Sequence, residues 1–298
     1  MDTAEVQRTA IYTLNINRLF TQPRLMANLP FIKMHGLSND YVYIDCFEED
    51  TAALIAHADL PALARRISDR HTGAGSDGLV LMLPDNEADA RMRIFNADGS
   101  EAQMCGNAIR CVGKYLYESY LCRRKQMTIA TQAGIRELAL QVTDGLVKNV
   151  KVNMGIPVIA AEAPILDTLP QAFTQVNMGN PHAVFFSEYE ISSEQLHRLG
   201  RQIATHQHFS EGTNVEFACV RNRSEIDLRV WERGSGETQA CGTGACAAAA
   251  AAIRLGYTGR DVTVHLPGGE LRIQWASDNE PIFMSGTATI VYRGEYYL

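Results

Sequence analysis

The amino-acid sequence predicts an α+β fold of two pseudo-symmetric domains, each a mainly antiparallel sheet curled around a central helix. Short strand-like segments joined by hairpin turns dominate the chain. The same order of segments occurs twice, with equivalent positions 136 residues apart. The helical segment after Gly242 carries seven alanines and is apolar nearly all round, so we expect a curled sheet to enclose it.

The first copy opens with two predicted strands, residues 31–34 and 41–45, around a turn at residues 35–40. A helix at 60–68 and strands at 78–83 and 90–96 follow. An amphipathic helix is then predicted, because five apolar residues share one face: Ala108, Ile109, Val112, Tyr115 and Leu116. The copy ends in a three-stranded meander at residues 127–131, 136–142 and 146–152. Its second turn, Asp144-Gly145, is a typical hairpin signal.

The second copy repeats this order. Its predicted elements are a strand at 183–186, a helix at 193–206, strands at 214–220 and 225–231, the alanine-rich helix, and a hairpin at 262–266 and 270–275. A final strand at 287–293 is expected to return to the first domain. We therefore expect the first domain to comprise residues 31–149 and 287–298, and the second to comprise residues 150–286.

One six-residue motif, Glu-x-Gln-x-Cys-Gly, occurs at residues 101–106 and again at 237–242. Each copy leads from a glycine-rich turn into a predicted helix, which places Cys105 and Cys241 at helix starts. Unpaired backbone N–H groups and the helix dipole favour a thiolate there. A lone cysteine is more often a buried, inert residue, and this reading is kept for the five cysteines outside the motif.

The repeat extends to single polar residues. Asn39, Asp77 and Cys105 follow one another at gaps of 38 and 28 residues, and their counterparts in the second copy follow at gaps of 34 and 27. Asn96 and Glu232 each lie nine residues before their cysteine. A duplication with this long a period indicates two similar domains facing a cleft. The counterparts in the second copy are Asn180, Asn214 and Cys241.

Two facing thiols of this kind suit acid/base chemistry. A thiolate on one side of a carbon removes a proton, and a thiol on the other side returns one, which inverts the stereocentre. The backbone N–H groups at Gly106-Asn107 and Gly242-Thr243 are expected to stabilise the carboxylate of the carbanion without a metal. A polar lining is expected from Asn39, Asn96, Asn180, Asn214, Glu232 and Arg233.

Structural alternatives exist for this lining. Asparagines at turns often serve the backbone, and Glu232-Arg233 is also readable as a surface ion pair. An Arg beside a Glu can also bind the carboxylate and ammonium groups of an amino acid. His182 is readable either as a substrate-orienting group or as a structural histidine.

Composition narrows the function further. The net charge of −7 argues against a nucleic-acid partner, and no apolar run is long enough to span a membrane. Seven scattered cysteines do not form a disulfide framework and favour the cytoplasm. No His/Cys set has zinc spacing. We expect residues 1–30 to form a loosely ordered extension. The alternative is a targeting segment, and Met26 is an alternative start of the protein.

The chain resembles the diaminopimelate epimerase family. The resemblance is carried by residues 31–45 (FIKMHGLSNDYVYID), 95–111 (FNADGSEAQMCGNAIRC), 178–182 (MGNPH) and 232–245 (ERGSGETQACGTGA). It implies two half-barrels with the site between them, and cofactor-independent interconversion of LL- and meso-2,6-diaminopimelate for lysine and peptidoglycan synthesis. It also implies that Cys105 and Cys241 are the acid/base pair. Gly78 stands where some members carry Gln.

Several rival readings are kept. A proline racemase typically has Met-Cys-Gly-His at the first cysteine, where this chain has Met104-Cys105-Gly106-Asn107. Phenazine-biosynthesis relatives lack the cysteine pair. A thiol redox protein would not need the polar lining, and an amino-acid-binding module would not need twin thiols. The expected partner is a small-molecule substrate, and a homodimer stays an open alternative.

Overall fold

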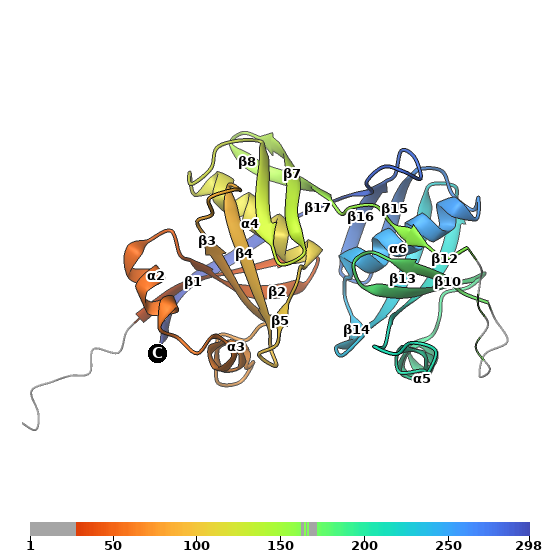
Figure 1. Cartoon of the computed structure of the whole chain (residues 1–298), viewed down its shortest axis with the longest axis horizontal. Coiled ribbons are helices and arrows are strands. Elements are labelled where there is room, and N and C mark those ends of the chain that lie inside the picture. The colour runs from red at the N-terminus through yellow and green to blue at the C-terminus, as the bar shows by residue number, and fades with distance from the viewer. Residues whose placement is uncertain (1–27, 162–163, 165, 167–171) are drawn as a thin grey trace, which may run out of the picture.

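The computed structural model describes the chain except for residues 1–27, 162–163, 165 and 167–171. Two lobes lie side by side, and a helix runs through each of them (Figure 1). These two helices are α4, Gly106–Glu118, and α6, Gly242–Arg254. The predicted extension falls mainly on residues outside the described part of the chain, as does Met26.

The first lobe in chain order contains eight strands and two further helices. The strands are β1 Asn28–Gly36, β2 Asn39–Asp45, β3 Gly78–Leu83, β4 Ala90–Asn96, β5 Glu101–Ala102, β6 Gln126–Thr131, β7 Gly134–Thr143 and β8 Leu146–Asn153. The helices are α2 Glu49–Ala56 and α3 Leu60–Ser68. The apolar face of α3 packs on β1–β4 through Leu63, Ala64 and Ile67.

The second half supplies the remaining elements. They are β9 Val158–Ile159, β10 Thr174–Asn177, β11 Pro181–Ser187, α5 Ser193–Ala204, β12 Asn214–Asn222, β13 Glu225–Glu232, β14 Gly236–Thr238, β15 Asp261–Leu266, β16 Gly269–Gln274, β17 Phe283–Gly286 and β18 Thr289–Tyr297. A capping box at Ser192 and Gln195 begins α5.

Strand pairing repeats between the halves. In the first, β2 is parallel to β3, β3 antiparallel to β4, β4 parallel to β6, and β6 antiparallel to β7. In the second, β11, β12, β13, β15 and β16 show the same sequence of orientations. The predicted α+β class and pseudo-symmetry are therefore confirmed.

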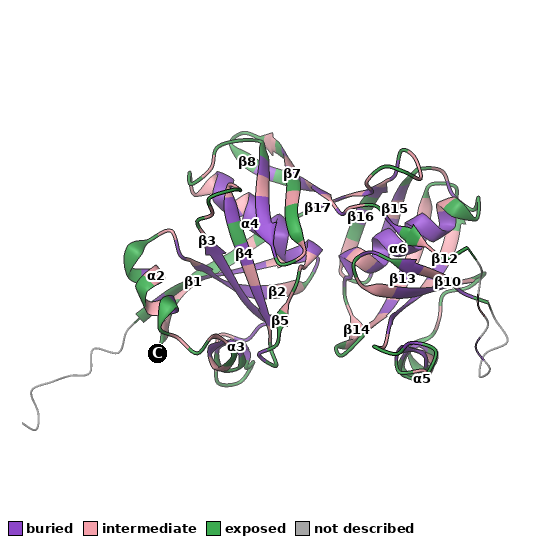
Figure 2. Cartoon of the chain, viewed as in Figure 1, coloured by how far each residue is buried: buried purple, intermediate pink, exposed green. Residues whose placement is uncertain are grey.

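The sheet of each half curves around its helix because the helix is apolar on nearly every side. Residues Ala247–Ala252 of α6 are all fully buried, and burial runs along α4 as well (Figure 2). Alanine side chains are short, so strands approach α6 closely from several directions. The alanine-rich stretch is thus a core helix.

Strand β17 pairs with β8 and so connects the two halves. Strand β18 pairs with β1 along nearly its whole length, so the final strand returns to the first lobe as predicted (Figure 1). The predicted domain boundary at residues 149/150 falls inside β8, and the boundary at 30/31 falls inside β1. Residues 28–30 are therefore strand rather than loose extension, because Asn28, Leu29 and Pro30 pair with residues 295–297 of β18.

Candidate active site

Each predicted acid/base cysteine is the N-cap of a central helix. Cys105 precedes α4 and Cys241 precedes α6, both in extended backbone conformation. The short strands β5 and β14 bring the chain back from β4 and β13 to these helix starts. The first residue of each helix is glycine, so no side chain covers the free N–H groups of the first turn.

The two helix starts lie against each other. A Cβ atom added to Gly242 would lie 3.6 Å from Gly106 Cα and 2.9 Å from Met284 Sδ. Across the same junction, Asn107 Nδ2 donates to the carbonyl oxygen of Ala240, at 3.0 Å. The structure therefore brings the two cysteine motifs together, 136 residues apart in sequence.

Cys105 is half-buried in the first half of the site. Its Sγ lies 3.5 Å from Asn39 Oδ1, and its thiol also hydrogen-bonds to the Tyr41 hydroxyl. Burial raises the pKa of the Cys105 thiol, whereas the N–H groups of Ala108 and Asn107 act in the opposite direction. Because burial dominates, the neutral thiol is favoured at rest.

Cys241 is buried in a different environment. Its Sγ accepts a hydrogen bond from Gly244 N at 3.4 Å and lies 3.6 Å from Thr243 Oγ1. Burial raises its pKa well above the ordinary value, and the carboxyl groups of Glu232 and Glu216 raise it further. The two thiols are thus equivalent in the fold but not in their surroundings.

Glu232 lies at the end of β13 beside Cys241. Its Oε1 accepts from Thr238 Oγ1 at 2.6 Å. Burial raises the pKa of this carboxyl, although its hydrogen bonds with Thr238 and Cys241 lower it. The neighbouring Arg233 is exposed, and its guanidinium donates to Glu211 O at 2.8 Å. The structure does not pair these two side chains as a simple surface ion pair.

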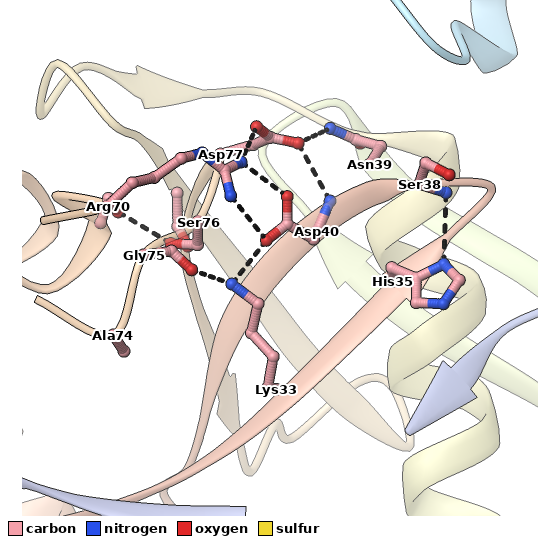
Figure 3. Close-up of polar contacts among 12 residues, drawn as sticks. Lys33, His35, Ser38, Asn39, Asp40, Arg70, Ala74, Gly75, Ser76 and Asp77 are labelled. Atoms are coloured by element: carbon pink, nitrogen blue, oxygen red, sulfur yellow. Dashed lines mark hydrogen bonds and ion pairs between the residues drawn. The ribbon is translucent and has the colours of Figure 1, made fainter. Parts of the chain in front are cut away.

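The asparagines lie at or beside the ends of strands, and Asn39 and Asn180 occupy equivalent places in the two halves. Asn39 opens β2 and donates to Asp77 Oδ2 at 2.9 Å (Figure 3). Asn180 Nδ2 lies 3.5 Å from Thr243 Oγ1, which links it to Cys241. Asn214 opens β12, where it accepts from Arg233 N at 2.9 Å. Asn96 ends β4 and donates to Ser100 Oγ at 3.0 Å.

His182 belongs to a buried polar pair. Its Nδ1 lies 2.7 Å from Glu216 Oε1, and both side chains are fully buried. Its Nε2 lies 3.0 Å from Asn180 Oδ1. Burial raises the pKa of Glu216, and His182 lowers it. His182 therefore holds the Asn180 amide in place rather than standing apart as a core residue.

Within the described ranges, no helix is long and apolar enough to cross a membrane. In the same part of the chain, no group of three or more His, Cys, Asp and Glu side chains is arranged to hold a metal ion.

The sequence of this chain is similar to those of known proteins. The family described as diaminopimelate epimerase matches residues 31–160 and 174–291. A diaminopimelate epimerase of Methanococcus maripaludis is 44% identical over 281 residues, covering 90% of this chain and 99% of its own. One from Desulfovibrio desulfuricans is 47% identical, covering 91% and 99%. This chain belongs to the diaminopimelate epimerase family. The predicted family and enzyme class, an isomerase, are confirmed.

Solved structures of lower identity share the fold. A probable proline racemase from Agrobacterium radiobacter has a TM-score of 0.69 at 16% identity, covering 91% of this chain and 93% of its own. A phenazine biosynthesis protein of Bacillus anthracis has a TM-score of 0.69 at 15% identity, covering 91% and 100%. This chain therefore shares its fold with the probable proline racemase and with the phenazine biosynthesis protein.

Sequence reasoning missed three neighbours of the family's cysteine pair. Tyr41 contacts Cys105, Glu216 lies behind Cys241, and Asp77 holds Asn39. Tyr41 and Glu216 lie inside strands β2 and β12, and no motif in the sequence distinguishes them from their neighbours in these strands. Gly78 has no room for a side chain, since a Cβ would lie 2.1 Å from Phe95 O and 2.9 Å from the Tyr41 ring.

Proposed function

We propose that this protein interconverts LL- and meso-2,6-diaminopimelate through a two-base mechanism in which Cys105 and Cys241 are the acid/base pair. This proposal rests on the junction of the two helix starts. There, the residues next to the two equivalent cysteines come into contact from opposite halves. Family membership supports the substrate, and the paired thiols support the chemistry. The reaction needs one proton acceptor and one proton donor, and the two cysteines supply both.

The reaction begins with one cysteine as thiolate and the other as thiol. The thiolate takes the α-proton, and the electron pair stays on the α-carbon, delocalised into its carboxylate. The opposite thiol then gives its proton to the other face, which inverts the centre. Each turnover leaves the thiolate on the other sulfur, so the enzyme returns to its first state through solvent exchange or the reverse reaction.

Backbone donors supply the main electrostatic stabilisation in this proposal. The N–H groups of Gly106, Asn107, Gly242 and Thr243 belong to the first turns of two helices whose starts lie against each other. A carboxylate there gains two hydrogen-bonding sites and two helix dipoles as charge develops on it. Removal of such a donor typically slows catalysis by roughly 10²–10³-fold.

The remaining residues are assigned to the rest of the substrate. Glu232 suits an ammonium group and Arg233 a carboxylate. The four asparagines complete the polar lining of the site: Asn39, Asn96, Asn180 and Asn214. The differences between equivalent positions, such as Asn96 against Glu232, suit a substrate in which one stereocentre is kept and the other inverts.

We assign the protein to the cytoplasm, to the pathway that supplies lysine and peptidoglycan, and to no nucleic-acid or membrane partner. A homodimer is also proposed. Its support is the exposed apolar side chains Val291, Tyr292 and Tyr297 on β18, which pairs with β1. Sedimentation velocity tests it: a single monomeric species at micromolar concentration would refute the dimer.

Cysteine variants test the two-base mechanism. We expect Cys105→Ala and Cys241→Ala each to abolish formation of the meso isomer from LL-diaminopimelate, because each removes one of the two proton-transfer groups. Cys219→Ala is the matched control, since Cys219 is a free cysteine on β12 outside the motif. Wild-type turnover in either of the first two variants would rule the mechanism out.

A further inference from the structure

The Asn39 amide is fixed in one orientation by groups that only accept hydrogen bonds. Its Nδ2 faces the Asp77 carboxylate at 2.9 Å. Its Oδ1 accepts from Asn107 Nδ2 at 3.2 Å, and Asn107 Nδ2 also faces the Ala240 carbonyl. Because a carboxylate and a carbonyl cannot donate, both amides are locked. Asn39 must therefore present its oxygen to Cys105 Sγ, 3.5 Å away.

Residues outside the cysteine site hold the Asp77 carboxylate in place. Its Oδ2 also accepts from Asp40 N at 3.0 Å, and its Oδ1 accepts from Arg70 at 2.8 Å. Arg70 bridges Asp77 and Asp40, and the buried Lys33 pairs with Asp40 from below (Figure 3). Burial alone would raise the pKa of Asp40, but Arg70 and Lys33 bring it below its ordinary value. The cluster therefore stays charged and ordered.

The second half lacks this arrangement. Asn214 stands at the position equivalent to Asp77, and its amide donates to Pro181 O while accepting from Arg233 N. Asn180, equivalent to Asn39, is instead oriented by His182. Cys241 receives a backbone N–H rather than facing an amide oxygen. The two thiols thus face different acceptors, a neutral amide oxygen at Cys105 and the Glu232 carboxyl at Cys241.

We propose that Asp77, held by Arg70, is a positioning residue that keeps the Asn39 amide oxygen on Cys105 and thereby keeps Cys105 protonated in the resting enzyme. An amide oxygen pairs with an S–H group but repels a thiolate. Loss of Asp77 leaves the 3.2 Å contact with Asn107 Nδ2 to orient the amide, so the amide rotates more readily and offers its NH₂ group, which favours the thiolate. Five other ionisable groups act on Cys105: Tyr41, Tyr43, Arg110, Cys111 and Glu232.

Alkylation of the free enzyme tests this role. The rate of iodoacetamide addition to Cys105 is followed by peptide mass spectrometry between pH 6 and 10. We expect Asp77→Ala to raise the rate at pH 7 about tenfold and to move the pH profile downward by roughly one unit, which corresponds to one hydrogen bond. Asp77→Asn keeps an oxygen for Asn39 Nδ2 and Asp40 N, so it should restore the wild-type profile.

Matched controls separate positioning from loosened structure. Asp85 lies in the same half, accepts two backbone N–H groups and pairs with Arg91, yet does not contact Asn39. Asp85→Ala should leave the Cys105 profile unchanged. Unchanged Cys105 reactivity in Asp77→Ala would overturn the proposal. A parallel rise at the buried Cys111 and Cys246 would also overturn it, since that indicates general opening.

This role presupposes that Cys105 is one of the proposed acid/base groups, but the alkylation rate is measured without substrate. The two proposals can therefore fail separately. A wild-type enzyme that converts no diaminopimelate but shows the Asp77-dependent profile would leave the positioning role standing. A fully active wild-type enzyme with no Asp77 dependence would leave only the two-base mechanism.

Discussion

At the scale of single residues, the site is asymmetric although the fold is not. Asn39 places an amide oxygen on Cys105, while Gly244 places a backbone donor on Cys241. Glu232 lies beside the second thiol and has Asn96 as its equivalent in the first half. A pseudo-symmetric pair of cysteines thereby acquires two distinct environments, as a substrate with two unlike ends requires.

The Glu232 carboxyl is expected to serve both Cys241 and the substrate. Glu232→Gln removes a charge that raises the pKa of Cys241, so we expect faster Cys241 alkylation at pH 8. The loss of one charged hydrogen bond to the substrate should lower kcat/KM by roughly 10–100-fold. The control is Glu237→Gln, since Glu237 is a half-buried partner of Arg229 and His197. Equal effects of the two substitutions would contradict this role.

The raised pKa values of the two thiols predict the direction of the pH dependence. The reaction needs one thiolate, and burial disfavours the thiolate at Cys105 and Cys241. The fraction of enzyme with one thiolate therefore grows as pH rises, and we expect kcat/KM to increase from pH 6.5 to 8.5. Initial rates across this range provide the check. A rate that falls over the same interval would be inconsistent with thiolate catalysis.

At the scale of elements, periodicity predicted most strands and both central helices. The helix α3 has the predicted bounds, and β3 and β4 do as well. Strands such as β5, β9 and β14 were missed because two or three residues cannot show alternation. Helix α2 was also missed, since its eight residues form only about two turns and its N-terminus has no side-chain cap.

The turn between β1 and β2 shows what periodicity cannot reveal. The predicted turn at residues 35–40 narrows to Leu37 and Ser38, both with positive φ angles of 55° and 67°. Sequence rules expect Gly or Asn there. The positive φ angle is tolerated at Leu37 because its side chain is buried and packs against Gly269, the first residue of β16. The contact between halves thus determines a local conformation.

That contact yields a prediction for Gly268. A Cβ at this position would lie 2.3 Å from Leu37 O, which is backbone and cannot give way. Gly268→Ala should push the two turns apart, displace Asn39 and lower kcat/KM more than tenfold, since small misplacement is costly in catalysis. In Gly259→Ala, the new atom would lie 3.5 Å from its nearest neighbour. Comparable activity in Gly268→Ala and Gly259→Ala would show that the contact between Gly268 and Leu37 does not position the site.

At the scale of the whole molecule, the sequence repeat predicted the pseudo-symmetry and the meeting of Cys105 and Cys241. It did not predict that β17 would pair with β8. A repeat identifies equivalent positions, but it does not specify which strand edges pair between copies. Asp77 was also recognised only as an equivalent of Asn214, since its contact with Asn39 depends on the pairing of β2 with β3, which the sequence does not specify.

Buried thiols make stability depend on alkaline pH. Burial raises the pKa of Cys246 to about 12 and that of Cys111 to about 11, against roughly 8.5 in an unfolded chain. The folded state therefore holds protons that the unfolded state loses, and stability falls as pH rises above about 8.5. Thermal unfolding of Cys246→Ala between pH 8.5 and 10.5 should show a shallower decline, by up to about 1.4 kcal/mol per pH unit. Identical slopes would contradict this.

The most direct test of the two-thiol account is incubation of the reduced enzyme with LL-diaminopimelate in D₂O without added cofactor. Facing acid and base groups predict that the meso isomer forms and that its inverted α-carbon carries deuterium from the solvent-exchanged thiol. The product is analysed by mass spectrometry and chiral chromatography. Formation of the meso isomer with the original proton retained, or no conversion by intact enzyme, would contradict the account.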